Sequence, residues 1–290
     1  MEVQRELPRA VTEQGKSKEF GYNVIHTVRV LRHPEKNSMD GNLTPKGERD
    51  SSKMGELYSR WKKRYDDKVE FERIAHSGRK RPKRAAELIK KEFAASSENI
   101  VNASEDKNLD YRSSSTFDQA YADAVRDAYP EGKINFDKEG AGVQIVVDTN
   151  DVPFDEESAS SKESSQNIAQ SLLDLVNDMK NSRSNTHKRS IFLSHSAVIE
   201  NFIVDMLELR SEQDSVSKIG GGAGFLEGFE FRIEQLDPDN IQIKVRFETP
   251  NYSKYSEAER ERLKKLYDIS LTKEKLEQLA GANKPKLKTV

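Results

Sequence analysis

Short runs of β-branched and aromatic residues alternate with longer segments of helical periodicity, and this alternation limits most strongly what the chain can fold into. The runs are strand candidates at residues 26–31, 69–76, 190–194, 229–233 and 241–247. Helical patterns cover about 44–65, 82–94, 165–181 and 197–209. Strands that alternate with helices of this length predict an α/β fold, with a mainly parallel central sheet covered by helices on both faces. The last two strands, separated by LDPDN, predict an antiparallel hairpin at one edge.

The 290 residues suffice for one large α/β domain with insertions. We expect a flexible leader over residues 1–20 and an α/β domain over residues 21–250. The stretch at about 96–164 is rich in Ser, Asp, Glu and Asn, which predicts an inserted cap of loops and short helices. Residues 251–290 carry a charged helical pattern and predict a C-terminal helical extension.

Composition excludes several classes of protein. The 48 basic and 50 acidic residues nearly cancel, which argues against a surface devoted to nucleic acid or membrane. The absence of cysteine excludes disulfides, thiolate catalysis and cysteine-ligated metal centres. No apolar stretch has the length of a signal peptide core or a membrane span, so we expect a cytoplasmic protein without a membrane partner.

Three of the predicted strands are followed at once by polar or cationic residues. VRVL precedes Arg32 and His33, RIAHS precedes GRKRPKR, and IFLS precedes His195. Residues that follow parallel strands converge on one edge of the sheet, where ligands bind. The helix that begins after His195 adds free N–H groups to that edge. Arginine can grip two oxygens of a phosphate, so this set of residues predicts an anion site that suits phosphate.

Simpler interpretations exist for several of these features. His26, His76 and His187 are expected to be hydrogen-bonded structural residues. RKRPKR at 79–84 could be a basic surface patch, and GGGAGFLEG at 220–228 is interpreted as a flexible turn that enters the hairpin.

Three blocks of the sequence resemble the histidine phosphatase superfamily, and in particular its phosphoglycerate-mutase-like branch. LRHPEK followed by NLTPKGERDS is similar to the opening strand, the Arg-His-Gly-Glu signature and the Leu-Thr-x-x-Gly helix start of that family. HSGRKRPKRAAELI resembles the second block and places Ser77, Arg81, Ala85 and Ala86 in register. IFLSHSAVIENFI resembles the third block. Together the blocks cover about residues 26–210.

The resemblance implies hydrolysis of phosphate monoesters through a phosphohistidine on His33, with no metal and no cofactor. Arg32, Arg81 and His195 would hold the phosphoryl oxygens, and His195 would serve best when protonated. The neutral imidazole of His33 must attack, so its other ring nitrogen should donate to a backbone carbonyl or a similar acceptor.

A general acid must protonate the leaving oxygen, and the family takes it from the insertion after the second block. Asp110 in KNLDYR is the preferred candidate, and Glu105 and Asp118 are alternatives. Pro34 stands where the family usually has glycine, which removes one possible backbone donor to phosphate.

The resemblance leaves the substrate open between a phosphorylated small molecule and a phosphoprotein. NLDYRSSS lacks the Leu-x-Glu and Tyr-Gly of the mutase branch, so hydrolysis is favoured over a phosphoglycerate-mutase-like phosphotransfer. A second hypothesis is a phosphatase-like protein that binds phosphate or phosphoprotein with little or no turnover. A third is nucleic-acid binding through RKRPKR, which the near-neutral net charge disfavours. The sequence carries no indication of oligomeric state.

Overall fold

The structure is a computed structural model of the chain. It describes residues 24–35, 42–64, 69–95, 102–111, 113–116, 155–179, 187–221, 226–237, 240–248 and 256–281, with residues 119, 123, 143–144, 146–148, 152–153 and 223. The leader expected at 1–20 lies outside the described residues.

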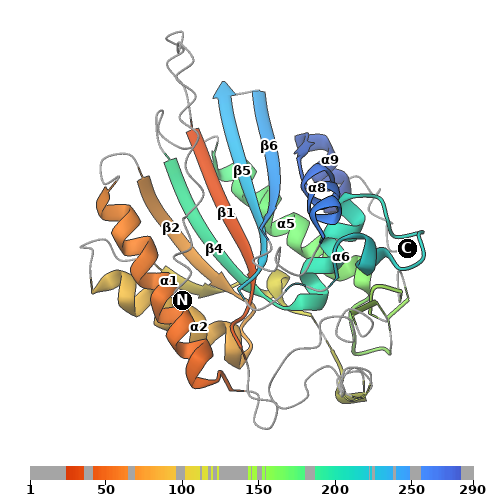
Figure 1. The fold of residues 1–290 in the computed structure, drawn as a ribbon, viewed down its shortest axis with the longest axis horizontal. Coiled ribbons are helices and arrows are strands. Elements are labelled where there is room, and N and C mark those ends of the chain that lie inside the picture. The colour runs from red at the N-terminus through yellow and green to blue at the C-terminus, as the bar shows by residue number, and fades with distance from the viewer. Residues whose placement is uncertain are drawn as a thin grey trace, which may run out of the picture.

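A seven-stranded mixed sheet forms the centre of the molecule, in the order β3-β2-β4-β1-β5-β6-β7 (Figure 1). The strands are β1 (Val24–Arg32), β2 (Val69–His76), β3 (Asn102–Glu105), β4 (His187–Ser194), β5 (Gly228–Asp237), β6 (Asn240–Glu248) and β7 (Ile269–Leu271). Strands β3, β2, β4 and β1 are parallel, whereas β5, β6 and β7 join them in antiparallel pairs. The predicted α/β class, with its parallel centre and its hairpin, is confirmed.

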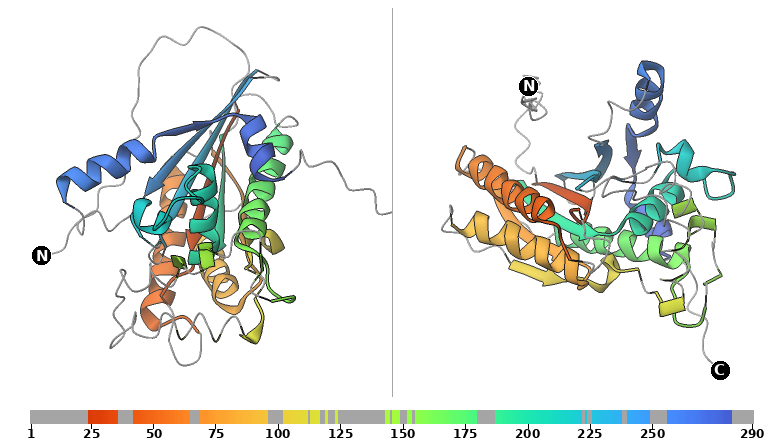
Figure 2. Two further views of the ribbon diagram at one scale, coloured as in Figure 1. Left: turned by 90° about the vertical axis from the view of Figure 1, so that its right-hand side faces the viewer. Right: turned by 60° about the horizontal axis from the view of Figure 1, so that its bottom comes forward.

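Helices cover both faces of the sheet (Figures 1 and 2). Helices α1 (Pro45–Arg64) and α2 (Lys80–Ala94) pack on one face, and α5 (Ser161–Met179) and α6 (Ser196–Met206) pack on the other. Shorter elements are η1 (Lys107–Leu109), α7 (Ser215–Lys218), α8 (Glu257–Leu266) and α9 (Lys273–Leu279). None of the helices in the described ranges is long and apolar enough to cross a membrane.

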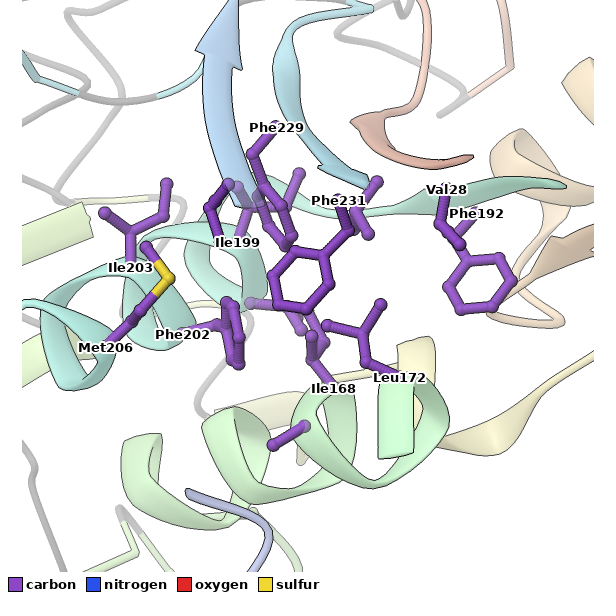
Figure 3. Close-up of a cluster of buried hydrophobic side chains, with 14 of the residues drawn as sticks. Val28, Ile168, Leu172, Phe192, Ile199, Phe202, Ile203, Met206, Phe229 and Phe231 are labelled. Atoms are coloured by element: carbon purple, nitrogen blue, oxygen red, sulfur yellow. The ribbon is translucent and has the colours of Figure 1, made fainter. Parts of the chain in front are cut away.

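Alternation along the buried strands builds a core on each side of the sheet. Val28 and Val30 of β1 face α5 and α6, whereas Leu31 faces α1 and α2. On the first side a cluster of aromatic rings joins α6 to β5, with the rings of Phe202 and Phe229 stacked at 5.3 Å (Figure 3). Both faces of the parallel strands are therefore covered by apolar side chains, and the buried polar side chains of these strands pair with one another, as His26 does with Ser190.

Two strands form where the sequence predicted none. Strand β3 lies inside the stretch expected to be loops and short helices, and β7 lies between the two helices of the C-terminal segment and pairs outside the predicted edge hairpin. NASE of β3 is polar and mostly exposed, and β7 has three residues. Neither segment carries the period of an amphipathic strand, because edge pairing requires only backbone groups.

Candidate active site

The end of β4 anchors the segments that follow its neighbours. The carbonyl of Ser194 accepts from the backbone N–H of His33 at 2.9 Å, and that of Leu193 accepts from Ser77 at 3.2 Å. The Ser194 hydroxyl donates to the carbonyl of Leu109 at 2.7 Å. The residues after β1, β2 and η1 are thereby tied to one end of the sheet, as the strand-end pattern predicted.

His33 and His195 lie in contact at this end. Their ring centroids are 5.4 Å apart and the planes meet at 69°. His33 follows β1 and is 3 % exposed, whereas His195 follows β4 and is the N-cap residue of α6. Two histidines separated by 162 positions in the chain therefore share one site.

The ring of His33 is held in the orientation that a nucleophile needs. Its Nδ1 lies 2.8 Å from the carbonyl oxygen of Pro34, which can only accept, so Nδ1 donates and Nε2 keeps its lone pair. Burial holds the pKa of His33 well below its usual value, and the charges of Arg81, His195 and Arg32 lower the pKa further. The carbonyl of Pro34 is the backbone acceptor expected from the sequence.

Both predicted arginines belong to this group of side chains. Arg32, the last residue of β1, is 3 % exposed, and its Nη1 donates to the carbonyl of Ala223 at 2.6 Å. Arg81 is half-buried in the first turn of α2. After burial, its charge is the largest cause of the lowered pKa of His33.

Asp110 reaches the same place from the loop after η1. Its Oδ1 lies 3.6 Å from Nε2 of His195 and accepts from Nε of Arg79 at 2.5 Å. Arg79 also donates to the carbonyl of Tyr111 and to the hydroxyl of Ser113. Nε2 of His195 also lies 2.9 Å from the hydroxyl of Ser77.

The other candidate acids are placed differently. Glu105, at the end of edge strand β3, packs against Gly78, and its charge partly offsets the lowering of the His76 pKa by burial. Asp118 lies outside the described residues. Of the candidates that the structure describes, Asp110 is the one that lies beside the histidine pair.

The remaining histidines are hydrogen-bonded structural residues. His26 pairs with the hydroxyl of Ser190 at 2.9 Å, and His187 pairs with that of Thr27 at 3.1 Å. Burial lowers the pKa of each to about 3, so both remain neutral at ordinary pH. His76 accepts from the backbone N–H of Gly78 at 3.0 Å.

Three residues at this site carry no signal in the sequence that predicts their contacts. The sequence pattern assigns Arg79 to a basic patch, but in the structure Arg79 donates to Asp110. The pattern assigns Ala223 to a turn, but its carbonyl accepts from Arg32, and it gives no indication that Glu200 is buried. These contacts join segments far apart in the chain, and no local pattern announces them.

Two imidazoles and one carboxylate therefore lie together at this end of the sheet, and the charges of Arg32 and Arg81 act on the pKa of His33. Such a set can bind a tetrahedral oxyanion and can provide a neutral nitrogen nucleophile. The described residues hold no group of three or more histidine and acidic side chains arranged to bind a metal ion.

Comparisons with known proteins identify only distant similarities. No family model matches the chain, and no curated protein matches its sequence. A mycobacterial glucosyl-3-phosphoglycerate phosphatase in complex with inorganic phosphate is similar in structure, with a TM-score of 0.46 and 11 % identity, over 77 % of this chain and 95 % of that one. The Bacillus anthracis phosphoglycerate mutase is similar with a TM-score of 0.45 and 15 % identity, over 80 % of this chain and 95 % of that one. An Entamoeba histolytica phosphoserine phosphatase is similar with a TM-score of 0.39 and 17 % identity, over 72 % of this chain and 90 % of that one.

These neighbours include phosphatases and a phosphoglycerate mutase, the kinds of enzyme that the motif resemblance named. TM-scores below 0.5 are too low to assign an activity to this chain.

Proposed function

We propose that the protein is a phosphoric monoester hydrolase of the histidine phosphatase type, with His33 as nucleophile. The observation that carries the proposal is the bonding of His33. Its Nδ1 is occupied by the Pro34 carbonyl, its pKa is lowered by burial and by nearby cations, and it touches the second histidine. A neutral imidazole with a fixed tautomer among arginines suits attack on a bound phosphate.

The reaction takes place in two steps. Nε2 of His33 attacks phosphorus, a P–N bond forms, and the P–O bond to the leaving group breaks. Arg32, Arg81 and His195 stabilise the charge on the three equatorial oxygens during this transfer. A water molecule then attacks phosphorus from the side that the leaving group vacated, the P–N bond breaks, and inorganic phosphate and neutral His33 are restored.

Asp110 is the proposed general acid. A proton on its carboxyl would pass to the leaving oxygen in the first step, and the carboxylate would take a proton from the attacking water in the second. Its position 3.6 Å from His195 supports this assignment, because His195 marks the phosphoryl pocket.

A second candidate function is phosphate binding with little turnover. The observation that favours it is the ion pair between Asp110 and Arg79, since a neighbouring guanidinium stabilises the carboxylate and opposes its role as an acid. In that case the anion pocket would persist without efficient release of the leaving group.

Turnover of an aryl phosphate by wild type and by His33→Ala tests the proposal. We expect the substitution to abolish turnover and also to abolish an acid-labile phosphoenzyme, trapped by quenching with labelled substrate. His187→Gln is the matched control, because His187 lies at the opposite end of β4 and pairs with Thr27. Equal turnover by wild type and His33→Ala would remove His33 from the mechanism. Phosphate binding without any phosphoenzyme would favour the second candidate.

A further inference from the structure

Glu200 is a carboxyl group buried in α6, next to the buried amide of Asn201. It is 1 % exposed, and its helix neighbours Val198, Ile199 and Phe202 belong to the core. A buried carboxyl destabilises a protein unless it is hydrogen-bonded or neutral. Its contacts therefore indicate what it does.

One oxygen of Glu200 accepts two hydrogen bonds. The Ser196 hydroxyl donates to Oε1 at 2.9 Å, and the backbone N–H of Ala223 donates to the same atom. The other oxygen, Oε2, is buried and has no hydrogen-bond partner among the described residues. Burial raises the pKa of this carboxyl, although the Ala223 hydrogen bond and the charge of Arg32 act to lower it, and Oε1 is the acceptor for both donors.

Ala223 links this carboxyl to the proposed phosphoryl site. Its N–H binds Glu200, and its carbonyl oxygen accepts from Nη1 of Arg32 at 2.6 Å. The segment that follows is also tied to Arg32, because Leu226 donates to the Arg32 carbonyl at 3.1 Å and Glu227 accepts from its N–H at 2.8 Å. One residue of the loop thus joins the buried carboxyl to the guanidinium.

The orientation of Arg32 matters because a guanidinium binds phosphate through a planar fork. Rotation of that plane would misalign both donors. Burial raises the pKa of Glu200 to about 8, so the carboxyl that accepts from Ala223 is mainly neutral near pH 7. A neutral acceptor can hold Ala223 in place without cancelling the positive charge that Arg32 presents to an anion.

We propose that Glu200 is a positioning residue for the phosphoryl site, holding Ala223 so that the Ala223 carbonyl fixes the guanidinium of Arg32. The inference rests on the proposed function, because it assigns Arg32 to the phosphoryl group. Glu200 itself touches neither the substrate nor the reacting atoms.

The test compares Glu200→Gln with Glu200→Met. Gln keeps an acceptor at the Oε1 position, whereas Met conserves the volume, removes the acceptor and adds no buried charge. We expect Glu200→Gln to bind inorganic phosphate at pH 6.5 with the affinity of wild type. Glu200→Met should bind phosphate about tenfold more weakly or worse, since a small misplacement of a positioning group can reduce the rate or affinity of a site by up to about a hundredfold. Isothermal titration with phosphate and with vanadate measures this without turnover.

A double-mutant cycle with Arg32→Lys separates positioning from general destabilisation. Lysine keeps the charge of Arg32 and loses its fork, so the loss caused by Glu200→Met should largely disappear in that background. Ile203→Ala, a core change on the same helix, is the matched control and should leave phosphate affinity unchanged in the folded protein.

The outcomes are separable from those of the proposed function. Additive losses in the cycle, or wild-type phosphate affinity in Glu200→Met, would overturn the positioning role even if turnover persists. Wild-type protein that binds phosphate without turnover would reject the hydrolase while the binding cycle still decides the role of Glu200. Should Glu200→Met fail to fold, Glu200→Gln decides the question. If Glu200 positions Arg32, its ionisation at high pH should weaken phosphate binding in wild type, and Glu200→Gln should keep its affinity for phosphate over the same pH range. A tenfold loss of phosphate affinity in Glu200→Gln at pH 6.5 would contradict the proposal.

Discussion

His33 and His195 touch, yet the nitrogens of their rings are bound differently. The Pro34 carbonyl accepts from Nδ1 of His33, so Nε2 is the unprotonated nitrogen of that ring, whereas Nε2 of His195 lies beside Ser77 and Asp110. Such a difference in partners would allow two identical side chains to serve in the proposed roles of nucleophile and oxyanion ligand. The sequence could predict that both histidines reach one edge, because each follows a parallel strand. It could not predict their partners, which come from other segments.

Asp110 is tested by the dependence of rate on the leaving group. Asp110→Asn should slow hydrolysis of an alkyl phosphate by about 10²–10⁴-fold, because an alkoxide leaves only with a proton. Hydrolysis of a nitrophenyl phosphate should slow far less, since its leaving oxygen is already stable as an anion. Steady-state kinetics with the two substrates measures the contrast, and Glu105→Gln is the control, since Glu105 packs against Gly78. Equal losses for the two substrates would exclude Asp110 as the acid.

Glu200 should also make stability depend on pH. Its pKa is about 8 in the folded protein and near 4.5 in the unfolded chain, so folding takes up a proton between these values. The stabilisation is complete below pH 4.5 and is lost as the pH rises through 8. Glu200→Gln cannot ionise, so the free energy of unfolding of wild type should fall relative to this variant by a few kcal/mol between pH 5 and 9. Urea unfolding at several pH values would reveal this, and parallel curves for the two proteins would show that Glu200 is not the titrating group.

At the scale of elements, the start of α1 is hydrogen-bonded to the segment that follows His33. The carbonyl of Glu35 accepts from the backbone N–H of Thr44 at 3.0 Å, and the Thr44 hydroxyl caps the helix by accepting from Gly47 at 3.0 Å. A Cβ at Gly47 would lie 2.3 Å from the same Glu35 carbonyl. The glycine of the Leu-Thr-x-x-Gly pattern is therefore required by close approach of two backbones, one of which continues from the proposed nucleophile.

Gly47→Ala should therefore impair both stability and activity. The added methyl group would meet the backbone of Glu35, so α1 and the segment that follows His33 must move apart. Gly55→Ala is the matched control, since its Cβ would meet the Ile89 carbonyl at 2.6 Å, in the contact between α1 and α2. We expect both variants to unfold at lower urea concentration, with a loss of kcat/KM confined to Gly47→Ala. A normal kcat/KM in folded Gly47→Ala would show that this contact does not position the nucleophile.

Elements with strong periodic patterns could be predicted from sequence, and weakly patterned ones could not. Strand β2 has the predicted bounds, and α2 differs from its prediction only at its start, because buried apolar residues mark their length. Strands β3 and β7 escaped prediction, since their place in the sheet depends on edge pairing. The contact between Ala223 and Arg32 could not be predicted for a similar reason, because a glycine-rich sequence does not specify which carbonyl accepts from an arginine.

At the scale of the whole molecule, the C-terminal segment expected to be an extension packs into the same core as the sheet. Leu263, Tyr267 and Leu276 are buried in the larger hydrophobic cluster, and α9 packs on α5. The Tyr267 hydroxyl donates to the carbonyl of Ile219, and Arg262 donates to that of Lys218 at 2.9 Å. The segment thereby anchors the chain that leads into the Ala223 loop.

This packing predicts that the C-terminal segment and the sheet unfold together. Leu276→Ala leaves a cavity in the shared core and should lower the free energy of unfolding by about 2–5 kcal/mol. The only tryptophan, Trp61, lies in α1 on the opposite face of the sheet. In one cooperative unit its fluorescence and the far-ultraviolet circular dichroism should shift to the same lower urea midpoint. Lys265→Ala on the exposed surface of α8 should move neither by more than about 0.5 kcal/mol. If Leu276→Ala splits the dichroism transition and leaves the Trp61 midpoint unmoved, the segment folds as a separate unit, and its contacts with residues 218–219 cannot support the phosphoryl site.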